Sequence, residues 1–177
     1  VRAIPGVRSA SLTLNGLGSG GQRISGFRVP GRTFEEGQTP AEENHVTPEF
    51  FATTGITFVA GRGFTDRDTE GSPTVAVLTE RAATKFFGGA DSAVGKRFGY
   101  GDPNMEVIGV VRDVRPHGLR SAQPALVFRA LAQEPQEYAT SLEARVSGAA
   151  AIAVPAVRRA LASVDPDLPV SEVTTME

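Results

Sequence analysis

The hydrophobic positions along this chain change their spacing several times, and each change predicts an element of secondary structure. Apolar and polar residues alternate toward the end of residues 7–14, which predicts a strand. The same alternation over residues 141–146 predicts a strand whose inward side carries Leu142, Ala144 and Val146.

Runs with little alternation predict buried strands. Residues 73–78 predict one, and residues 105–111 predict a central strand covered on both faces, because almost every position is apolar. A polar stretch rich in Gly, Pro and Glu over residues 30–43 predicts a loop or the tip of a hairpin. Further strands are expected at residues 26–29, 56–60, 124–129 and 169–173.

Capping residues locate a first helix. Thr47 can cap it with its hydroxyl, and Pro48 fits the first helical position, where no backbone donor is needed. Gly55 can adopt the left-handed conformation that ends a helix. The residues of this helix expected to face inward are Phe50, Phe51 and Thr54.

Two further helices follow. Thr79 can cap the second, and Gly88 can end it; its apolar face would consist of Ala82, Ala83, Phe86 and Phe87. The last helix spans roughly Ile152 to Ser163 and tolerates Pro155 because that residue lies in the first turn. Its apolar positions at helical spacing are Val154, Val157, Leu161 and Val164. Mixed strands with about three helices predict an α+β fold.

Composition and charge argue against several classes of function. The 177 residues carry a net charge of −2, which gives no electrostatic reason to expect a nucleic acid partner. The chain has no cysteine, so disulfides and thiolate metal sites are excluded. No stretch approaches the ~18 apolar residues needed to span a bilayer. The start at Val1 leads us to expect a piece of a longer protein.

Two glycine-rich segments imitate nucleotide-binding motifs. Residues 16–21 satisfy the G-x-G-x-x-G pattern, but residues 22–28 lack the helical pattern that should hold a pyrophosphate. Residues 89–97 imitate a phosphate-binding loop, yet the glycine spacing is wrong and Arg97 replaces the magnesium-binding hydroxyl. We expect a flexible loop at the first segment and a turn into a strand at the second.

The acidic residues and histidines give no site either. Residues 66–71 resemble half of a calcium loop, but Val77 occupies the position of the bidentate Glu, so Asp66 or Asp68 is expected to accept backbone N–H bonds in a turn. His45 and His117 are expected at the surface or in loops. The pairs Glu35-Glu36 and Glu42-Glu43 are expected to be solvated. We therefore assign no catalytic, cofactor-binding or metal-binding residue.

A series of motifs in fixed order resembles one family. The chain is similar to the extracytoplasmic core domain of MacB-type, FtsX-like ABC transporter permeases. The residues that carry the resemblance are Ile4-Pro5-Gly6-Val7, Val46-Thr47-Pro48-Glu49-Phe50-Phe51, Gly55-Ile56, Ala60-Gly61-Arg62, Phe64-Thr65, Val75-Ala76-Val77-Leu78, Ala82-Ala83, Phe86-Phe87, Val94-Gly95-Lys96-Arg97-Phe98, Val107-Ile108-Gly109-Val110-Val111 and Asp165-Pro166-Asp167-Leu168-Pro169-Val170. They extend over nearly the whole chain.

The resemblance implies two lobes and a mechanical role. Residues 1–63 and 138–177 would form a porter-like α/β lobe, and residues 64–137 a smaller inserted strand-rich lobe. The domain would lie at the extracytoplasmic face of the inner membrane, between the first two membrane helices of a permease. It would relay motion driven by ATP hydrolysis in a separate cytoplasmic domain or subunit, with no catalysis of its own.

The implied partners are a second permease copy, the cytoplasmic ATPase acting through the membrane helices, and a periplasmic adaptor. The isolated piece would be a monomer or a weak dimer. Two alternatives stay open. One is a sensor module that binds a ligand between the lobes, and the other is a stand-alone enzyme with a nucleotide held by residues 16–21.

Overall fold

The computed structural model describes residues 1–19, 21–32, 41–118 and 121–175. Within these residues the elements in chain order are β1 (Val7–Thr13), β2 (Ile24–Ser25), β3 (Ala41–Val46), α1 (Phe50–Thr54), β4 (Phe58–Gly61), β5 (Val75–Thr79), α2 (Glu80–Phe87), α3 (Ala90–Ala93), β6 (Arg97–Phe98), β7 (Met105–Val111), β8 (Leu126–Ala130), a 3₁₀ turn (Leu131–Gln133), β9 (Ser141–Val146) and α4 (Ala150–Ala162). Strands and helices are mixed along the chain, which confirms the predicted α+β class.

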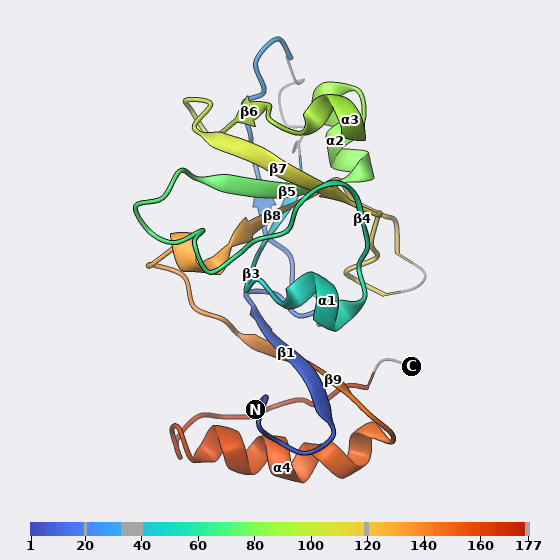
Figure 1. The fold of residues 1–177 in the computed structure, drawn as a ribbon, viewed down its shortest axis with the longest axis vertical. Helices are drawn as coiled ribbons and strands as arrows, with labels where there is room; N and C mark the ends of the chain where they lie inside the picture. Colours follow the sequence, from blue (N-terminus) through green and yellow to red (C-terminus); the bar gives the residue numbers. More distant parts are fainter. Residues whose placement is uncertain (20, 33–40, 119–120, 176–177) are drawn as a thin grey trace.

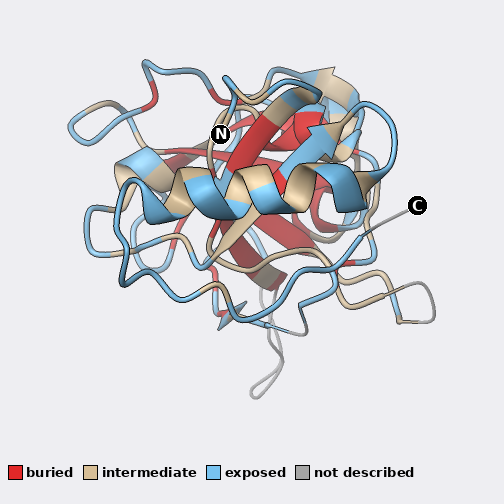
Figure 2. Cartoon of the chain, turned by 90° about the horizontal axis from the view of Figure 1, so that it is seen from below, coloured by how far each residue is buried: buried red, intermediate tan, exposed pale blue. Residues whose placement is uncertain are grey.

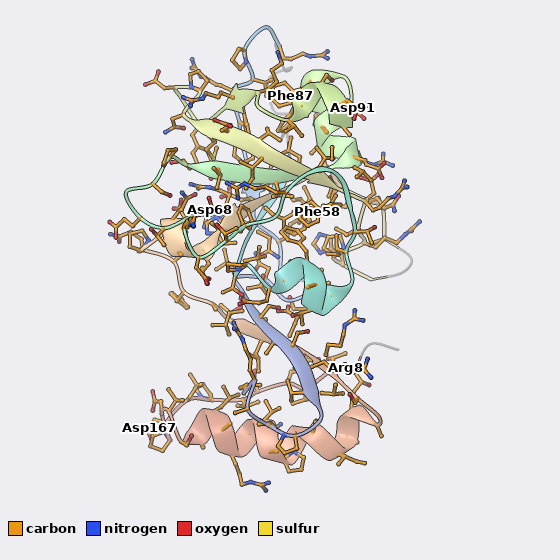
Figure 3. All side chains as sticks on the ribbon, in the orientation of Figure 1. Arg8, Phe58, Asp68, Phe87, Asp91 and Asp167 are labelled. Carbon is orange, nitrogen blue, oxygen red and sulfur yellow. The ribbon has the colours of Figure 1, made fainter. Side chains whose placement is uncertain are left out.

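The strands of the described residues form one mixed, nine-stranded sheet in the order β4-β7-β5-β8-β3-β1-β9. Off this path, β2 pairs with β3 and β6 pairs with β7. Figure 1 shows that most of the sheet, with α1, α2 and α3, occupies one end of an elongated molecule, while β1 and β9 run to α4 at the other. Figure 3 places Arg8 and Asp167 at the α4 end and Phe87 and Asp91 at the opposite end.

Alternate residues of the central strands fill two apolar cores. The first core, on the side of α2 and α3, includes Phe86, Phe98 and Leu78. The second core, on the side of α1, includes Phe50 and Phe128. Both faces of β7 contribute to these cores, so the prediction of a central strand at residues 105–111 is confirmed.

Local chemistry sets the helix ends largely as predicted. The Thr79 hydroxyl accepts a hydrogen bond from the Ala82 N–H at 3.4 Å at the start of α2. Gly88 and Gly55 end their helices with φ angles of 89° and 78°, a conformation that costs side-chain-bearing residues about 1–2 kcal/mol. The predicted Thr47 cap is wrong, because its hydroxyl accepts instead from the Leu12 N–H at 3.0 Å, where β1 passes alongside.

The predicted burial of α1 needs one correction. Phe50 and Phe51 are buried as expected, but the third buried residue is Thr53. Thr54 is only half-buried, and its hydroxyl donates back to the Phe50 carbonyl oxygen at 2.7 Å. The third buried position of this short helix is therefore one residue earlier than predicted.

The prediction for the faces of β9 is wrong. Glu143 is buried, Ala144 is exposed, and Leu142 and Val146 are only half-buried. An alternating pattern identifies two faces but does not say which one the rest of the molecule covers. Here the buried position is on the polar face, where Glu143 lies beside Ser11 of β1 and under the loop at Gly16.

The C-terminal part of the chain is also less buried than the sequence suggests. Within the described residues, α4 has no buried position, and Val164 is 84 % exposed. Figure 2 shows half-buried and exposed residues alternating along this helix. The strand expected at residues 169–173 is absent from the described structure, since that segment follows α4 without pairing to the sheet.

Candidate functional site

Strand β3 places three consecutive polar residues inside the molecule. Glu43, Asn44 and His45 are 1 %, 4 % and 0 % exposed. The predictions of a solvated Glu43 and a surface His45 are therefore wrong. Residues 41–46 form a strand between β8 and β1 instead of continuing the expected polar loop. Because side chains alternate along a strand, Glu43 and His45 point to one face and Asn44 to the other.

Glu43 is the buried centre of a hydrogen-bonded group, which we call the Glu43 cluster. Its carboxylate accepts hydrogen bonds from the Ser25 hydroxyl and from the Tyr100 hydroxyl, the latter at 2.6 Å. The His45 Nε2 lies 2.6 Å from one carboxylate oxygen, and the Arg129 guanidinium donates to the same oxygen at 3.3 Å. These hydrogen bonds connect strands β2, β3 and β8 with the turn after β6.

The surroundings of the cluster fix its charges. Burial raises the pKa of Glu43, but the hydrogen bonds from His45, Ser25 and Tyr100 outweigh that effect and lower it to about 2. Burial, together with the bond to Glu43, raises the pKa of Tyr100 to about 12. The Arg129 guanidinium pairs with two carboxylates, because it donates to Glu134 as well as to Glu43.

A carboxylate with a pKa of about 2 is a poor general base at neutral pH, because it holds a proton too weakly. The Nδ1 atom of His45 has no partner among the described residues, which favours the tautomer with its hydrogen on Nε2, facing Glu43. Tyr100 is held in place by stacking on Phe27, with ring centroids 5.0 Å apart. The Glu43 cluster is therefore suited to fixing strands and not to proton transfer.

Residues 12–15 and residues 44–47 form a joint where the two ends of the molecule meet. On the face opposite the Glu43 cluster, the Asn44 side chain accepts from the Thr13 hydroxyl at 2.9 Å and from the Asn15 N–H at 3.0 Å. It also donates to the Asn15 carbonyl oxygen at 2.8 Å. One buried amide therefore uses donor and acceptor to hold the end of β1 against β3.

The strand pairing at the joint is short. In the described part of the chain, β1 follows β9 from Val7 opposite Val146 onward, whereas its register with β3 consists of Thr13 opposite Val46. A second tie crosses from β9 to α1, where the Arg145 guanidinium donates to a helix carbonyl oxygen, that of Thr53, at 2.9 Å. Two backbone hydrogen bonds flank this register position, from the Leu14 N–H to the His45 oxygen and from the Thr47 N–H to the Leu12 oxygen, and the polar side chains add to them.

The segments that imitated chemical motifs have structural roles where they are described. No helix follows the described part of residues 16–21; the next element is β2, so the expected loop is confirmed and the dinucleotide context is missing. Residues 89–97 contain the short α3 and turn into β6, where Arg97 pairs with Glu106 at 3.4 Å. Residues Gly20, Glu35 and Glu36 lie outside the described residues.

Asp68 confirms the turn predicted for residues 66–71. Its carboxylate accepts from the Thr65 N–H at 2.8 Å and pairs with Arg62 at 3.0 Å, in the loop between β4 and β5 (Figure 3). Burial raises the pKa of Asp68, but these bonds outweigh it and hold the pKa below its usual value. His117 lies in the loop between β7 and β8, as expected, and contacts Glu42 at 2.7 Å. The Glu42 side chain is largely buried, which corrects the solvated position expected for it. Among the described residues, no group of three or more His, Cys, Asp or Glu could hold a metal ion.

The sequence offered little signal for the Glu43 cluster or the joint. Residues 41–46 show no apolar alternation, so a buried polar strand and a polar loop look the same in that segment. The partners of Glu43 are equally hidden, because Tyr100 and Arg129 stand 57 and 86 residues away along the chain. Only the sheet order brings them together.

With this geometry in place, comparison with known proteins identifies the class. The chain belongs to the family described as the MacB-like periplasmic core domain, whose model matches residues 1–164. The resemblance seen in the ordered motifs is thereby confirmed. No curated protein sequence matches the chain significantly. No helix in the described ranges is long and apolar enough to cross a membrane.

Solved structures share the fold at low sequence identity. The periplasmic region of MacB from Actinobacillus actinomycetemcomitans is 19% identical with a TM-score of 0.66, over 92% of this chain and 70% of that one. The extracellular domain of the noncanonic ABC-type transporter YknZ from Gram-positive bacteria is 17% identical with a TM-score of 0.63, over 93% and 80%. A domain of a putative permease from Porphyromonas gingivalis is 18% identical with a TM-score of 0.61, over 94% and 68%.

Proposed function

We propose that this periplasmic core domain relays ATP-driven motion, delivered through the membrane helices of an ABC transporter permease, to a substrate or partner outside the cytoplasm. ATP would be hydrolysed in a separate cytoplasmic domain or subunit. The domain would work at the extracytoplasmic face of the inner membrane beside a second permease copy, with a periplasmic adaptor as a further partner. Family membership and the fold shared with transporter domains support this proposal.

The observation that carries the proposal is the joint. β1 is a single strand that belongs to both ends of the molecule, and it meets β3 at one register position, Thr13 opposite Val46. Such a connection can transmit a pull along the strand and still permit a change of angle. The Asn44 bonds set its resting geometry.

The division into two lobes stays a prediction. Its first boundary, between residues 63 and 64, lies between β4 and β5, and its second, between residues 137 and 138, lies between β8 and β9. β4 in the first predicted lobe pairs with β7 in the second. β3 in the first lobe likewise pairs with β8 in the second. We propose that the larger movement occurs at the joint, which lies within the range 1–63 and not at a boundary between the two lobes.

The sensor alternative requires a ligand held between the two ends. A hollow of about 580 Å³ is present, but it is bordered by residues next to β6, at the end of the molecule far from the joint. Its lining residues are Phe27, Arg28, Val29, Pro30, Arg32, Gly101 and Pro103. A second hollow borders Asn15, Gly16 and Asn44 at the joint, but its volume of about 10 Å³ has room for no more than a water molecule. The positions and sizes of the two hollows favour the relay over a ligand-operated hinge.

The substitution Asn44→Ala in the full-length permease tests the relay. It removes the side-chain bonds that hold Asn15 and Thr13, and we expect faster hydrogen exchange at the Asn15 amide. We also expect transport to fall at least several-fold while ATP hydrolysis continues, because the two processes lose their coupling. The matched control is Asn104→Ala, which changes an exposed amide outside the joint. Full transport by an Asn44→Ala protein whose joint exchanges faster would overturn the proposal.

A further inference from the structure

Glu143 is a buried carboxyl group with no satisfactory partner. It lies on β9 with 9 % of its surface exposed, directly opposite Ser11 of β1. Among the described residues, neither of its carboxylate oxygens has a hydrogen-bond partner of good geometry, and the Ser11 hydroxyl lacks one too. An unpaired buried carboxyl is costly to ionise, because the charged form loses its hydration.

The loop after β1 covers this carboxyl. A Cβ atom placed on Gly16 would lie 2.7 Å from the Ser141 hydroxyl and 3.5 Å from a Glu143 oxygen, so the loop backbone rests on this face of β9. The same loop is fastened to the sheet region through Asn15, held by Asn44, and through the Gly18 N–H, which donates to a carbonyl oxygen at 2.7 Å. The cover of Glu143 is therefore part of the joint.

The charged groups around Glu143 do not compensate it. Arg145 is on the same face of β9, but its guanidinium is engaged with the Thr53 carbonyl oxygen. Glu49, just before α1, pairs with Arg2 at 2.7 Å. The residues that contact Glu143 from β1 and from the covering loop carry no charge; they include Ser11, Gly16 and Leu17.

The proton affinity of the group follows from this setting. Burial raises the pKa of Glu143 to about 7, and the Leu17 N–H and the Ser11 hydroxyl offset the burial only in part. Glu143 consequently changes charge near neutral pH. It does so beneath the loop that fastens β1 to the rest of the molecule.

We propose that Glu143 is a proton-dependent latch of the joint: the neutral carboxyl stays beneath residues 15–17 and keeps the joint closed, and the ionised carboxylate draws in water and loosens it. Protonation adds one hydrogen to a carboxylate oxygen, and no other bond changes. This pH dependence is a property of the chain itself, so its test does not depend on the relay function.

Distance measurements between spin labels test the latch directly. The chain has no cysteine, so labels attach only where cysteines are introduced, here as Lys96→Cys at one end and Ala151→Cys on α4 at the other. We expect a single narrow distance distribution at low pH that shifts or broadens as pH rises, with a midpoint near the pKa of about 7. The same labelled chain with Glu143→Gln should keep its low-pH distribution throughout.

Two results would overturn the latch. One is a distribution that does not change with pH in the unsubstituted labelled chain, and the other is an equal change in the Glu143→Gln chain. A second measurement needs no substitution at Glu143: carbon NMR of glutamate carboxyl groups should show its signal titrating near neutral pH. A midpoint near the usual value of 4.5 would count against the proposal.

Discussion

Replacing Glu43 by Gln should destabilise the chain strongly at neutral pH. The folded pKa of about 2 lies below the usual value of 4.5, and each unit of difference corresponds to about 1.36 kcal/mol. The ionised carboxylate therefore contributes about 3 kcal/mol to the free energy of unfolding. This is a large part of the roughly 5–15 kcal/mol typical of a domain.

The pH dependence gives the prediction its sign. Because folding lowers the pKa of Glu43, its contribution is fully present above pH 4.5 and is lost as pH falls through about 2. The Glu43→Gln variant lacks this ionisation. Its deficit of about 3 kcal/mol at pH 7 should therefore shrink as pH falls from 4.5 toward 2. Arg129 keeps Glu134 as a partner, which should hold the loss near the lower end of the ~3–5 kcal/mol seen for broken buried pairs.

Urea unfolding followed by far-ultraviolet circular dichroism provides the assay, since the chain has no tryptophan. The control is Glu106→Gln, which breaks an exposed pair with Arg97 and should cost less than about 1 kcal/mol. The reasoning is refuted if Glu43→Gln costs no more than this control at pH 7. It is refuted as well if the deficit persists undiminished near pH 2.

Two packing predictions use the same unfolding assay. Gly61→Ala should cost at least about 2 kcal/mol, because φ is +68° and the new Cβ would collide with the Ile108 carbonyl of β7. The control Gly71→Ala, with φ +84° and nothing within 4 Å, should cost only its backbone strain. Equal losses of stability in the two variants would contradict this. Phe128→Ala should cost about 3–5 kcal/mol, since the side chain is fully buried in the second core. The control Phe58→Ala, at a site 37 % exposed, should cost clearly less. The reverse order would be inconsistent with the packing.

The helix ends and the central strand could be predicted because their causes are local. A threonine hydroxyl three residues before a backbone N–H, as at Thr79, needs no distant partner. Gly55 and Gly88 end their helices for a similar reason, because only the local backbone conformation matters. Residues 105–111 were predictable as well, since a strand apolar at nearly every position must be covered on both sides.

The candidate site was not predictable because its causes are not local. Glu43 looks like any loop carboxylate until β2, β8 and the turn at Tyr100 bring hydrogen-bond donors to it. β9 shows the same limit in another form. Its alternation is real, but burial of its polar side depends on where β1 and the loop at Gly16 lie.

The sequence by itself determined the α+β class, most element positions and, through the order of its motifs, membership of the MacB-like periplasmic core domain family. Tertiary structure alone decided which polar side chains are buried, and with them the Glu43 cluster, the joint at Asn44 and the isolated carboxyl of Glu143. The physical reason is range: caps and apolar runs act over a few residues, whereas the energy of a buried polar group depends on partners that only the assembled sheet supplies.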